Sequence, residues 1–215
     1  MGKPYVIHIV GPPGSGKSFI CTRTQDIPCL DIDDFVKEAF AKLIKTSAKF
    51  RKLLTSPTKD RPNSIPGKAY VMVTGKAEKN LLQAIEETRA PLVVVVGIIF
   101  YPPCDTRLFI KMSATELEKA YRRVMLREAN KIRDNYDELT RIMRSTDVTQ
   151  VAATLLFGFG VGAINMLFHF PGYVKSYERM LKTEKKYGAL PKSQAQIIKF
   201  IVKKNKELSN PGKKS

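Results

Sequence analysis

Tryptophan is absent from the sequence, cysteine occurs only three times, and acidic side chains are scarce, with 20 Asp and Glu against 37 Lys and Arg. The cysteines, Cys21, Cys29 and Cys104, are odd in number and fit no metal-binding spacing, which favours a reducing, intracellular (cytoplasmic) compartment. The N-terminus lacks the basic and then apolar layout of a signal peptide. With 215 residues, 43% of them apolar, the chain can fold without disulfides or a structural metal.

The scarcity of acidic residues leaves a net charge of +17. Residues 1–147 contribute +8 and the much shorter stretch 148–215 contributes +9. A field of this sign attracts nucleic acid, anionic lipid or phosphorylated ligands, but a merely solvated lysine-rich surface gives the same number. The net charge alone therefore does not distinguish nucleic acid, anionic lipid and phosphorylated ligands as partners.

Apolar patterning predicts alternating strands and helices, and hence an α/β, three-layer αβα fold with a short parallel sheet. A capping box, Ser113 with Glu116, opens the helix that follows the last predicted strand. No fifth strand is predicted, and Gly67 and Gly75, each followed by lysine, are expected in turns. The predicted strands are residues 5–10, 27–32, 92–99 and 108–112, and the predicted helices are residues 19–25, 34–54, 77–88 and 113–136.

Residues 11–18, GPPGSGKS, match G-x-x-x-x-G-K-[ST] directly after a predicted strand and before a predicted helix. Glycines let the backbone wrap around a β-phosphate, and the amides at a helix N-terminus favour negative charge. In this pattern the lysine neutralises the β- and γ-phosphates and the serine hydroxyl ligates Mg²⁺, so ATP and Mg²⁺ are the expected cofactors. The expected nucleotide contacts are Gly11, Gly14, Ser15, Gly16, Lys17 and Ser18, with Lys17 also catalytic.

The loop resembles that of the P-loop kinases, the nucleoside/nucleotide and shikimate kinase-like group of the P-loop containing nucleoside triphosphate hydrolases. Residues 30–35, LDIDDF, resemble the D-x-D of shikimate kinase-like enzymes and the D-D-[FY] of nucleoside kinases and phage-type polynucleotide 5′-hydroxyl kinases. The resemblance covers about residues 5–135. It implies a P-loop fold and an ATP-dependent phosphotransferase.

Acidic residues at this position suit phosphoryl transfer, because the acceptor hydroxyl must be oriented and must lose its proton. On the resemblance, Asp33 contacts the substrate hydroxyl as general base, and Asp31 and Asp33 join Ser18 around the metal. Asp34 is either a second substrate contact or the N-cap of the next helix. A capping role is the structural alternative for each of the three.

Arginines follow on the helix after the fourth predicted strand, in the stretch 121–127, YRRVMLR. This pattern resembles the start of the lid in these kinases, whose arginines stabilise transition-state charge. Arg123 and Arg127 lie four residues apart and share a helix face, so they are the catalytic candidates. A solvated basic face is the alternative, and Arg133 and Arg141 are substitutes.

The sequence departs from the family at the end of its third predicted strand. Many relatives place an acidic residue there, whereas residues 96–100, VGIIF, contain none, and the next carboxylate is Asp105. Metal binding then depends on Ser18 with Asp31 and Asp33, or the enzyme is weakened or inactive.

Residues 148–174 contain no charged residue over 27 positions, which suggests dividing the chain into a nucleotide-binding domain, 1–147, and an α-helical C-terminal extension, 148–215. The stretch is long enough to span a membrane, but its glycines and polar residues make it only borderline hydrophobic. Two interpretations stay open: a buried or partner-facing hairpin, and membrane insertion.

Three functions compete at this point. The first is an ATP-dependent kinase that phosphorylates a nucleoside, a nucleotide or a similar small acceptor. The second is a polynucleotide 5′-hydroxyl kinase, which would explain the positive charge. The third is a non-catalytic P-loop protein attached to a membrane or an assembly through residues 151–170, with its basic tail in electrostatic contact.

Overall fold

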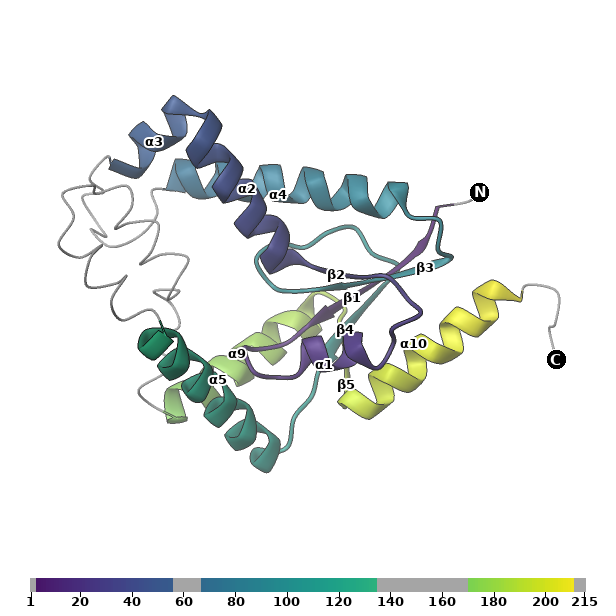
Figure 1. Ribbon diagram of the computed structural model, residues 1–215. Helices are drawn as coiled ribbons and strands as arrows, with labels where there is room; N and C mark the ends of the chain where they lie inside the picture. Colours follow the sequence, from purple (N-terminus) through teal and green to yellow (C-terminus); the bar gives the residue numbers. More distant parts are fainter. Residues whose placement is uncertain (1–2, 56–66, 135–169, 211–215) are drawn as a thin grey trace.

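The computed structural model describes residues 3–55, 67–134 and 170–210, which form a parallel sheet surrounded by helices (Figure 1). The strands are β1 (Tyr5–Val10), β2 (Cys29–Asp31), β3 (Leu92–Val96), β4 (Thr106–Ile110) and β5 (Leu190–Lys192). The helices are α1 (Lys17–Thr22), α2 (Ile32–Thr46), α3 (Ala48–Thr55), α4 (Gly67–Glu87), α5 (Ala114–Asp134), α9 (Phe170–Lys186) and α10 (Gln194–Ser209).

The sheet has five strands in the order β2-β3-β1-β4-β5, and all neighbouring strands are parallel. All five residues of β3, an unbroken Leu-Val-Val-Val-Val run, are buried, as expected for a strand that helices cover on both faces. The α/β class and the parallel sheet are therefore confirmed.

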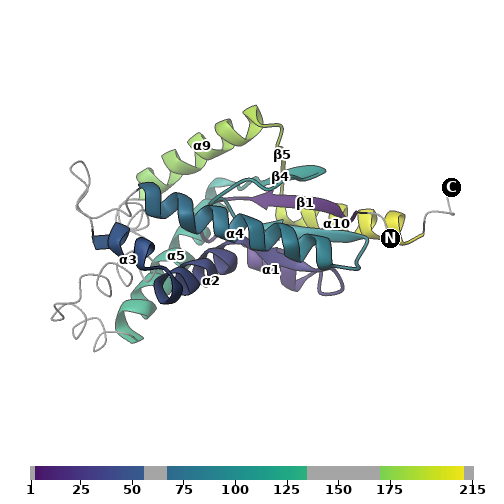
Figure 2. The same ribbon diagram turned by 90° about the horizontal axis from the view of Figure 1, so that it is seen from above.

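Helices cover both faces of the sheet, which is compatible with a three-layer αβα fold. Successive strand residues point to opposite faces. Val93 and Val95 accordingly pack in one core with α2, α3 and α4. Val94 and Leu108 pack in a second core with α1 and α10. Helix α9 lies opposite α1 and α10 (Figure 2).

Residues 97–105 join β3 to β4 without a helix. They run back across the sheet between α4 and α9. On one side the hydroxyl of Tyr70, in α4, donates to the carbonyl of Ile99 at 3.4 Å. On the other side the hydroxyl of Tyr101 donates to Glu184 Oε1, in α9, at 2.7 Å. This crossover therefore ties two helices that are far apart in the sequence.

The predicted turns at Gly67 and Gly75 are wrong, because both glycines lie in α4. Ala69, Val73 and Ala77 are buried at helical spacing in this part of α4. Their burial against the sheet outweighs the roughly 1 kcal/mol by which a glycine weakens a helix.

The single predicted helix 34–54 is two helices, which meet at Ser47. The backbone of Ser47 is extended, and its hydroxyl accepts a hydrogen bond from the amide of Phe50 at 3.1 Å. A serine in this role begins a new helix rather than continuing the old one.

The fifth strand, β5, was not predicted from the sequence. It has only three residues, includes Pro191, and pairs with β4. Helix α10 follows through a capping box of Ser193 and Gln196, and its residues Ile197 and Ile201 enter the core shared with β1 and β4. Residues 170–210 thus belong to the same sheet and core as the N-terminal part, while the predicted boundary at 147/148 lies outside the described residues.

No helix among the described residues is long and apolar enough to cross a membrane. The apolar stretch 148–174, and with it the proposed attachment segment 151–170, lies outside those residues except for positions 170–174, which open α9.

Candidate functional site

The glycine-rich loop connects β1 to α1 and is enclosed by helices from the other half of the chain. Gly14 and Gly16 have φ values of 75° and 88°, a region that favours glycine. A Cβ on Gly14 would collide with the carbonyl of Ala120, in α5, and one on Gly16 would collide with the amide of Gln194, in α10. Backbone conformation and close approach to the α5 backbone thus both fix Gly14, whereas Gly16 is fixed by its backbone conformation, because the flexible Gln194 side chain can move aside.

Lys17 folds back across this loop. Its ammonium donates to the carbonyls of Gly11 at 2.8 Å and Pro12 at 3.2 Å. Burial lowers the pKa of Lys17, the charges of Asp33 and Asp31 raise it, and the charge of Arg127 lowers it. Asp31, Asp33 and Arg127 therefore all lie within electrostatic reach of the Lys17 ammonium. These four residues come from three helices and a strand.

Asp31 is the N-cap of α2, because its carboxylate accepts from the amide of Asp33 at 2.9 Å. The helix begins at Ile32, before Asp34, so a capping role for Asp34 is wrong. Asp34 is exposed and pairs with Lys37 at 2.9 Å, and Asp33 is also exposed. Burial raises the pKa of Asp31, despite the opposing hydrogen bond from Asp33.

The two arginines chosen as lid candidates lie toward the loop. Arg123 donates from Nε and Nη2 to the carbonyl of Gly14, at 3.2 and 2.7 Å. Arg127, one turn further on, is near enough to Lys17 to lower its pKa. Arg122 pairs instead with Glu118 at 2.6 Å, within α5. Of the predicted substitutes, Arg133 is exposed near the end of α5, and Arg141 lies outside the described residues.

Two residues that hold the loop were not predicted. The Tyr173 hydroxyl, in α9, donates to the carbonyl of Pro13 at 2.6 Å, and Gln194 donates to the carbonyl of Ser15. Burial raises the pKa of Tyr173 to about 12. Because these contacts join residues at least 160 positions apart, no local sequence pattern could have indicated them.

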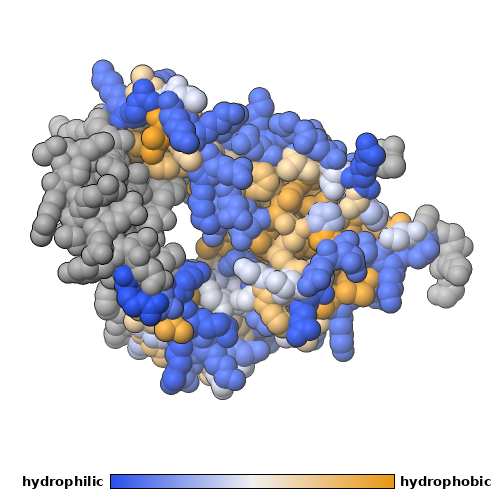
Figure 3. Space-filling view, viewed as in Figure 1, coloured by the Kyte–Doolittle hydropathy of each residue, from blue (hydrophilic) through white to orange (hydrophobic). Residues whose placement is uncertain are grey.

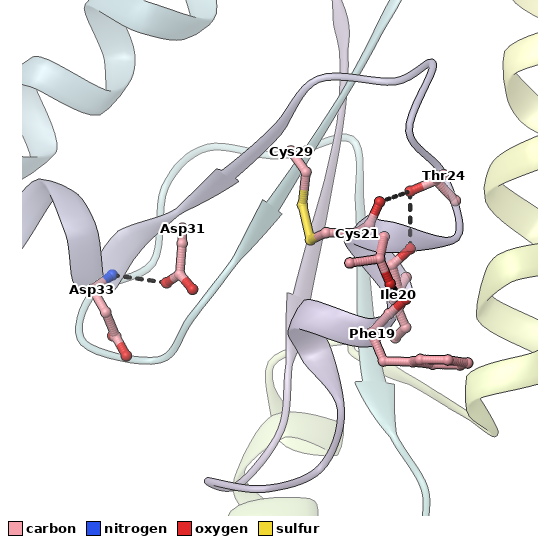
Figure 4. The surroundings of a disulfide bond; sticks show 8 residues. Phe19, Ile20, Cys21, Thr24, Cys29, Asp31 and Asp33 are labelled. Atoms are coloured by element: carbon pink, nitrogen blue, oxygen red, sulfur yellow. Dashed lines mark hydrogen bonds between the residues drawn. A yellow bond between two sulfur atoms is a disulfide. The ribbon is translucent and has the colours of Figure 1, made fainter. Parts of the chain in front are cut away.

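A disulfide joins Cys21, in α1, to Cys29, at the start of β2 (Figure 4). The odd number of cysteines and the lack of a metal-binding spacing did not indicate this bridge, which joins residues eight positions apart. The bridge ties the helix that follows the glycine-rich loop to the strand that ends at Asp31. Cys104 is free.

The end of β3 meets the start of α2 closely. A Cβ on Gly97, whose φ is 134°, would lie 2.6 Å from the Cβ of Ile32. Asp105, the next acidic residue, accepts from the amide of Val6 at 2.7 Å, at the beginning of β1 and therefore at the opposite edge of the sheet. At the end of β3 the candidate site thus has a tightly packed glycine and no carboxylate.

The charged groups at the loop bear on whether a magnesium nucleotide would fit. Within the described ranges, no cluster of three or more His, Cys, Asp or Glu side chains could hold a metal by itself. Mg²⁺ commonly takes only one or two carboxylates together with phosphates and water, and Asp31 and Asp33, within electrostatic reach of Lys17, are carboxylates of this kind. The surface is hollowed between α2 and α5, beside the loop (Figure 3).

No protein-family model matches the chain, and no curated protein does. Among solved structures, the crystal structure of TT1252 from Thermus thermophilus is similar, with 17% sequence identity and a TM-score of 0.43. The match covers 78% of this chain and all of the other. A likeness at this level carries no inference about activity.

Proposed function

We propose that the protein has a P-loop fold and is an ATP- and Mg²⁺-dependent phosphotransferase that acts on a nucleoside, a nucleotide or a similar small acceptor. One observation carries the proposal. The Lys17 ammonium lies across a glycine-rich loop, within electrostatic reach of Asp31, Asp33 and Arg127.

The loop supplies the binding part of the proposal. The first amides of α1 have no acceptor inside the helix and favour an anion. The two carbonyls that now accept from Lys17 are neutral, so a phosphate oxygen would replace them as a stronger, charged partner. Bound Mg·ATP would supply the γ-phosphoryl group and neutralise its charge, with Ser18 and Asp31 on the metal side.

Asp33 supplies the acceptor part. The Asp31 side chain is engaged in capping α2, whereas the Asp33 carboxylate is exposed at the first turn. Asp33 is therefore free of the capping task and can accept the proton of an acceptor hydroxyl. Asp34, paired with Lys37, contributes at most a secondary contact.

The arginines supply the charge stabilisation. Arg123 holds the Gly14 carbonyl through two donors. Arg127 stands closer to Lys17. Both belong to one helix face, so a small rotation of α5 would bring both guanidinium groups over the loop, where they would stabilise developing negative charge.

The test is transfer of labelled γ-phosphate from Mg·ATP to nucleosides, nucleotides and 5′-hydroxyl oligonucleotides. We expect Lys17→Ala and Asp33→Asn each to lower transfer by about 100-fold or more. Glu38→Gln, an exposed change one turn further along α2, is the matched control and should leave transfer unchanged. Labelling of the oligonucleotide pool alone would favour the polynucleotide 5′-hydroxyl kinase.

The absence of a carboxylate at the end of β3 favours a second candidate, a non-catalytic nucleotide-binding protein. In that case ATP binds, Lys17→Ala abolishes binding, and no acceptor pool is labelled by the wild type. That result would overturn the phosphotransferase.

A further inference from the structure

Three consecutive peptide carbonyls of the glycine-rich loop each accept hydrogen bonds from a different helix. The Tyr173 hydroxyl, in α9, donates to the first carbonyl at 2.6 Å. Arg123, in α5, donates to the second from Nε at 3.2 Å and from Nη2 at 2.7 Å. The side-chain amide of Gln194, in α10, donates to the third. We call Tyr173, Arg123 and Gln194 the loop clamp, and the carbonyls that it holds belong to Pro13, Gly14 and Ser15.

The surroundings of the loop clamp fix its donors before any ligand arrives. Tyr173 is only 2% exposed, and its ring centroid lies 5.6 Å from that of Tyr121, in α5. Gln194 is the first residue of α10, whose start is fixed by a capping box. Helix α5 rests on the loop itself, because a Cβ on Gly14 would lie 2.7 Å from the Val124 side chain. Donors on packed helices lose little conformational freedom when they hold a neighbouring group.

A carbonyl that is held also orients the N–H group that follows it. In a trans peptide unit these two groups point in opposite directions, and the peptide bonds of the loop are trans. The N–H groups of Gly14, Ser15 and Gly16 are therefore directed away from the loop clamp. The Ser15 N–H donates across the loop to the Pro12 carbonyl at 3.2 Å. Because a helix lies on the carbonyl side of each of these three peptide units, their N–H side faces the inside of the loop.

The loop by itself does not fix these orientations. Gly14 and Gly16 have positive φ, and glycine has more backbone freedom than any other residue. Pro12 and Pro13 have no N–H group, so Gly14 supplies the first N–H group after Gly11. Successive N–H groups in a turn of this kind form a cradle for anions. Since the cradle has few N–H groups, turning one peptide unit outward removes a large share of the hydrogen bonds that an anion can accept.

We propose that Arg123, Tyr173 and Gln194 are positioning residues, which set the affinity of the glycine-rich loop for a polyphosphate by holding its N–H groups inward. This inference rests on the proposed function, in the part that places a nucleotide at the loop. The ligand class is a polyphosphate, because its several charged oxygens can accept from the loop N–H groups, from the first amides of α1 and from Lys17 together. All three clamp residues contact carbonyls, so they act through the loop and not by touching the ligand.

Arg123 thereby takes a role different from the direct charge contact that a rotation of α5 would give it. Both of its donors would have to leave the Gly14 carbonyl before the guanidinium could reach a phosphate. Arg127, within electrostatic reach of Lys17, keeps the charge contact. A positioning arginine changes the affinity for the ligand, whereas an arginine that stabilises transition-state charge changes the rate at saturation.

The test is calorimetric titration of the full chain with inorganic tripolyphosphate and, separately, with Mg·ATP. Tyr173→Phe and Gln194→Met each remove one donor and keep the length of the side chain, and each should weaken binding about fivefold. Arg123→Gln removes a charged donor and should weaken binding about tenfold. Because the loop clamp acts on the part of the site that holds phosphates, each variant should weaken both ligands by a similar factor.

Matched controls remove the same groups from neighbouring positions. Tyr177→Phe, one turn further along α9, removes a hydroxyl that accepts from the Met112 amide at 2.9 Å. Arg122→Gln removes a guanidinium that pairs with Glu118 at 2.6 Å within α5. Both should keep wild-type affinity. Urea unfolding of every variant separates affinity from stability, because Tyr177→Phe should lose stability without losing affinity.

The possible failures of this inference and of the proposed function differ in the titrations. Wild-type affinity in all three clamp variants would overturn the inference alone, because the loop would still bind its ligand. Equal losses in the clamp and control variants would overturn it too, since a general loosening of the helices would then explain the effect. A wild type that binds neither tripolyphosphate nor Mg·ATP would overturn the proposed function and the inference with it.

The transfer assay adds a kinetic measurement for Arg123. Arg123→Gln should raise the KM for ATP and change kcat little. A fall in kcat at wild-type affinity would assign Arg123 to the charge contact and overturn its positioning role. Lack of transfer by a wild type that binds Mg·ATP would overturn the phosphotransferase but not the loop clamp, since the titrations measure binding without transfer.

Discussion

The glycine-rich loop, near the start of α9, and the ring of Tyr101, near its end, differ in how far the sequence reveals them. At the loop a local motif supplies the glycines and Lys17, and distant helices then hold it through Tyr173 and Gln194. At Tyr101 no motif precedes the contact with Glu184, which comes from a segment 83 residues away. Among the described residues, both regions contain a buried polar atom without a hydrogen-bond partner, Ser15 Oγ in the loop and Glu184 Oε2 beside Tyr101. The loop site is thus recognisable from its motif, whereas the surroundings of Tyr101 exist only in the folded chain.

Each region contains a glycine with positive φ, and these glycines give the largest contrast. Gly14→Ala should destabilise the protein by at least about 3 kcal/mol, because a strained backbone adds to collisions with Ala120 and Val124. Gly188→Ala, whose φ is 79° but whose surroundings are open, should cost only about 1 kcal/mol. Urea unfolding measures both, and equal losses would show that α5 does not pack on the loop as described.

His8 gives the next largest effect, and it depends on pH. Burial lowers the pKa of His8 to about 4, below its unfolded value of about 6.5. The unfolded chain binds the proton more readily than the folded chain. Neutral His8 therefore contributes its full stabilisation of the fold above about pH 6.5, and this stabilisation is lost as the pH falls towards 4. The loss is about 3 kcal/mol.

His8→Gln is the control for this titration. Its side-chain amide can still donate to the Gly97 carbonyl, but it does not titrate. Unfolding free energies measured at several pH values should therefore fall less steeply for His8→Gln than for wild type. Parallel curves would mean that His8 is not buried as a neutral side chain.

The disulfide belongs to the loop region and gives an intermediate effect. Closing a loop of eight residues stabilises a fold by about 2.5 kcal/mol in the chain-entropy description. Reductant should therefore lower the unfolding free energy of wild type and of Cys104→Ser by this amount, and should leave Cys21→Ser unaffected. Loss of the reductant effect in Cys104→Ser instead would assign the bridge to other cysteines.

The features that were predicted correctly from the sequence are those that depend on neighbouring residues. The buried run of β3 and the capping box of Ser113 are confirmed, the latter by hydrogen bonds between Ser113 and Glu116 at 2.7 to 3.3 Å. The loop motif likewise lies between a strand and a helix, as predicted. Each of these depends on residues within a few positions of one another.

Features that depend on distant partners could not be predicted in the same way. Strand β5 has three residues and becomes a strand only because β4 lies beside it. Tyr173 and Gln194 reach the loop from positions more than 150 residues away. Their sequence neighbourhoods carry no mark of that contact, since a tyrosine in an amphipathic helix normally indicates only a core position.

The last comparison concerns two tyrosine hydroxyl groups, that of Tyr173 near the start of α9 and that of Tyr101, which donates to Glu184 near the end of α9. Tyr101→Phe leaves the buried Glu184 carboxylate without its donor and should cost about 1–3 kcal/mol. Tyr173→Phe removes a hydrogen bond to the Pro13 carbonyl, a neutral acceptor, and should cost about 1 kcal/mol. Ligand binding separates the two further. Tyr173→Phe frees the loop and should weaken ATP binding measured by calorimetry, whereas Tyr101→Phe should leave ATP binding unchanged, because its hydroxyl contacts Glu184 and not the loop. If both variants weakened ATP binding equally, α9 would couple the two regions, and they could not be treated as independent.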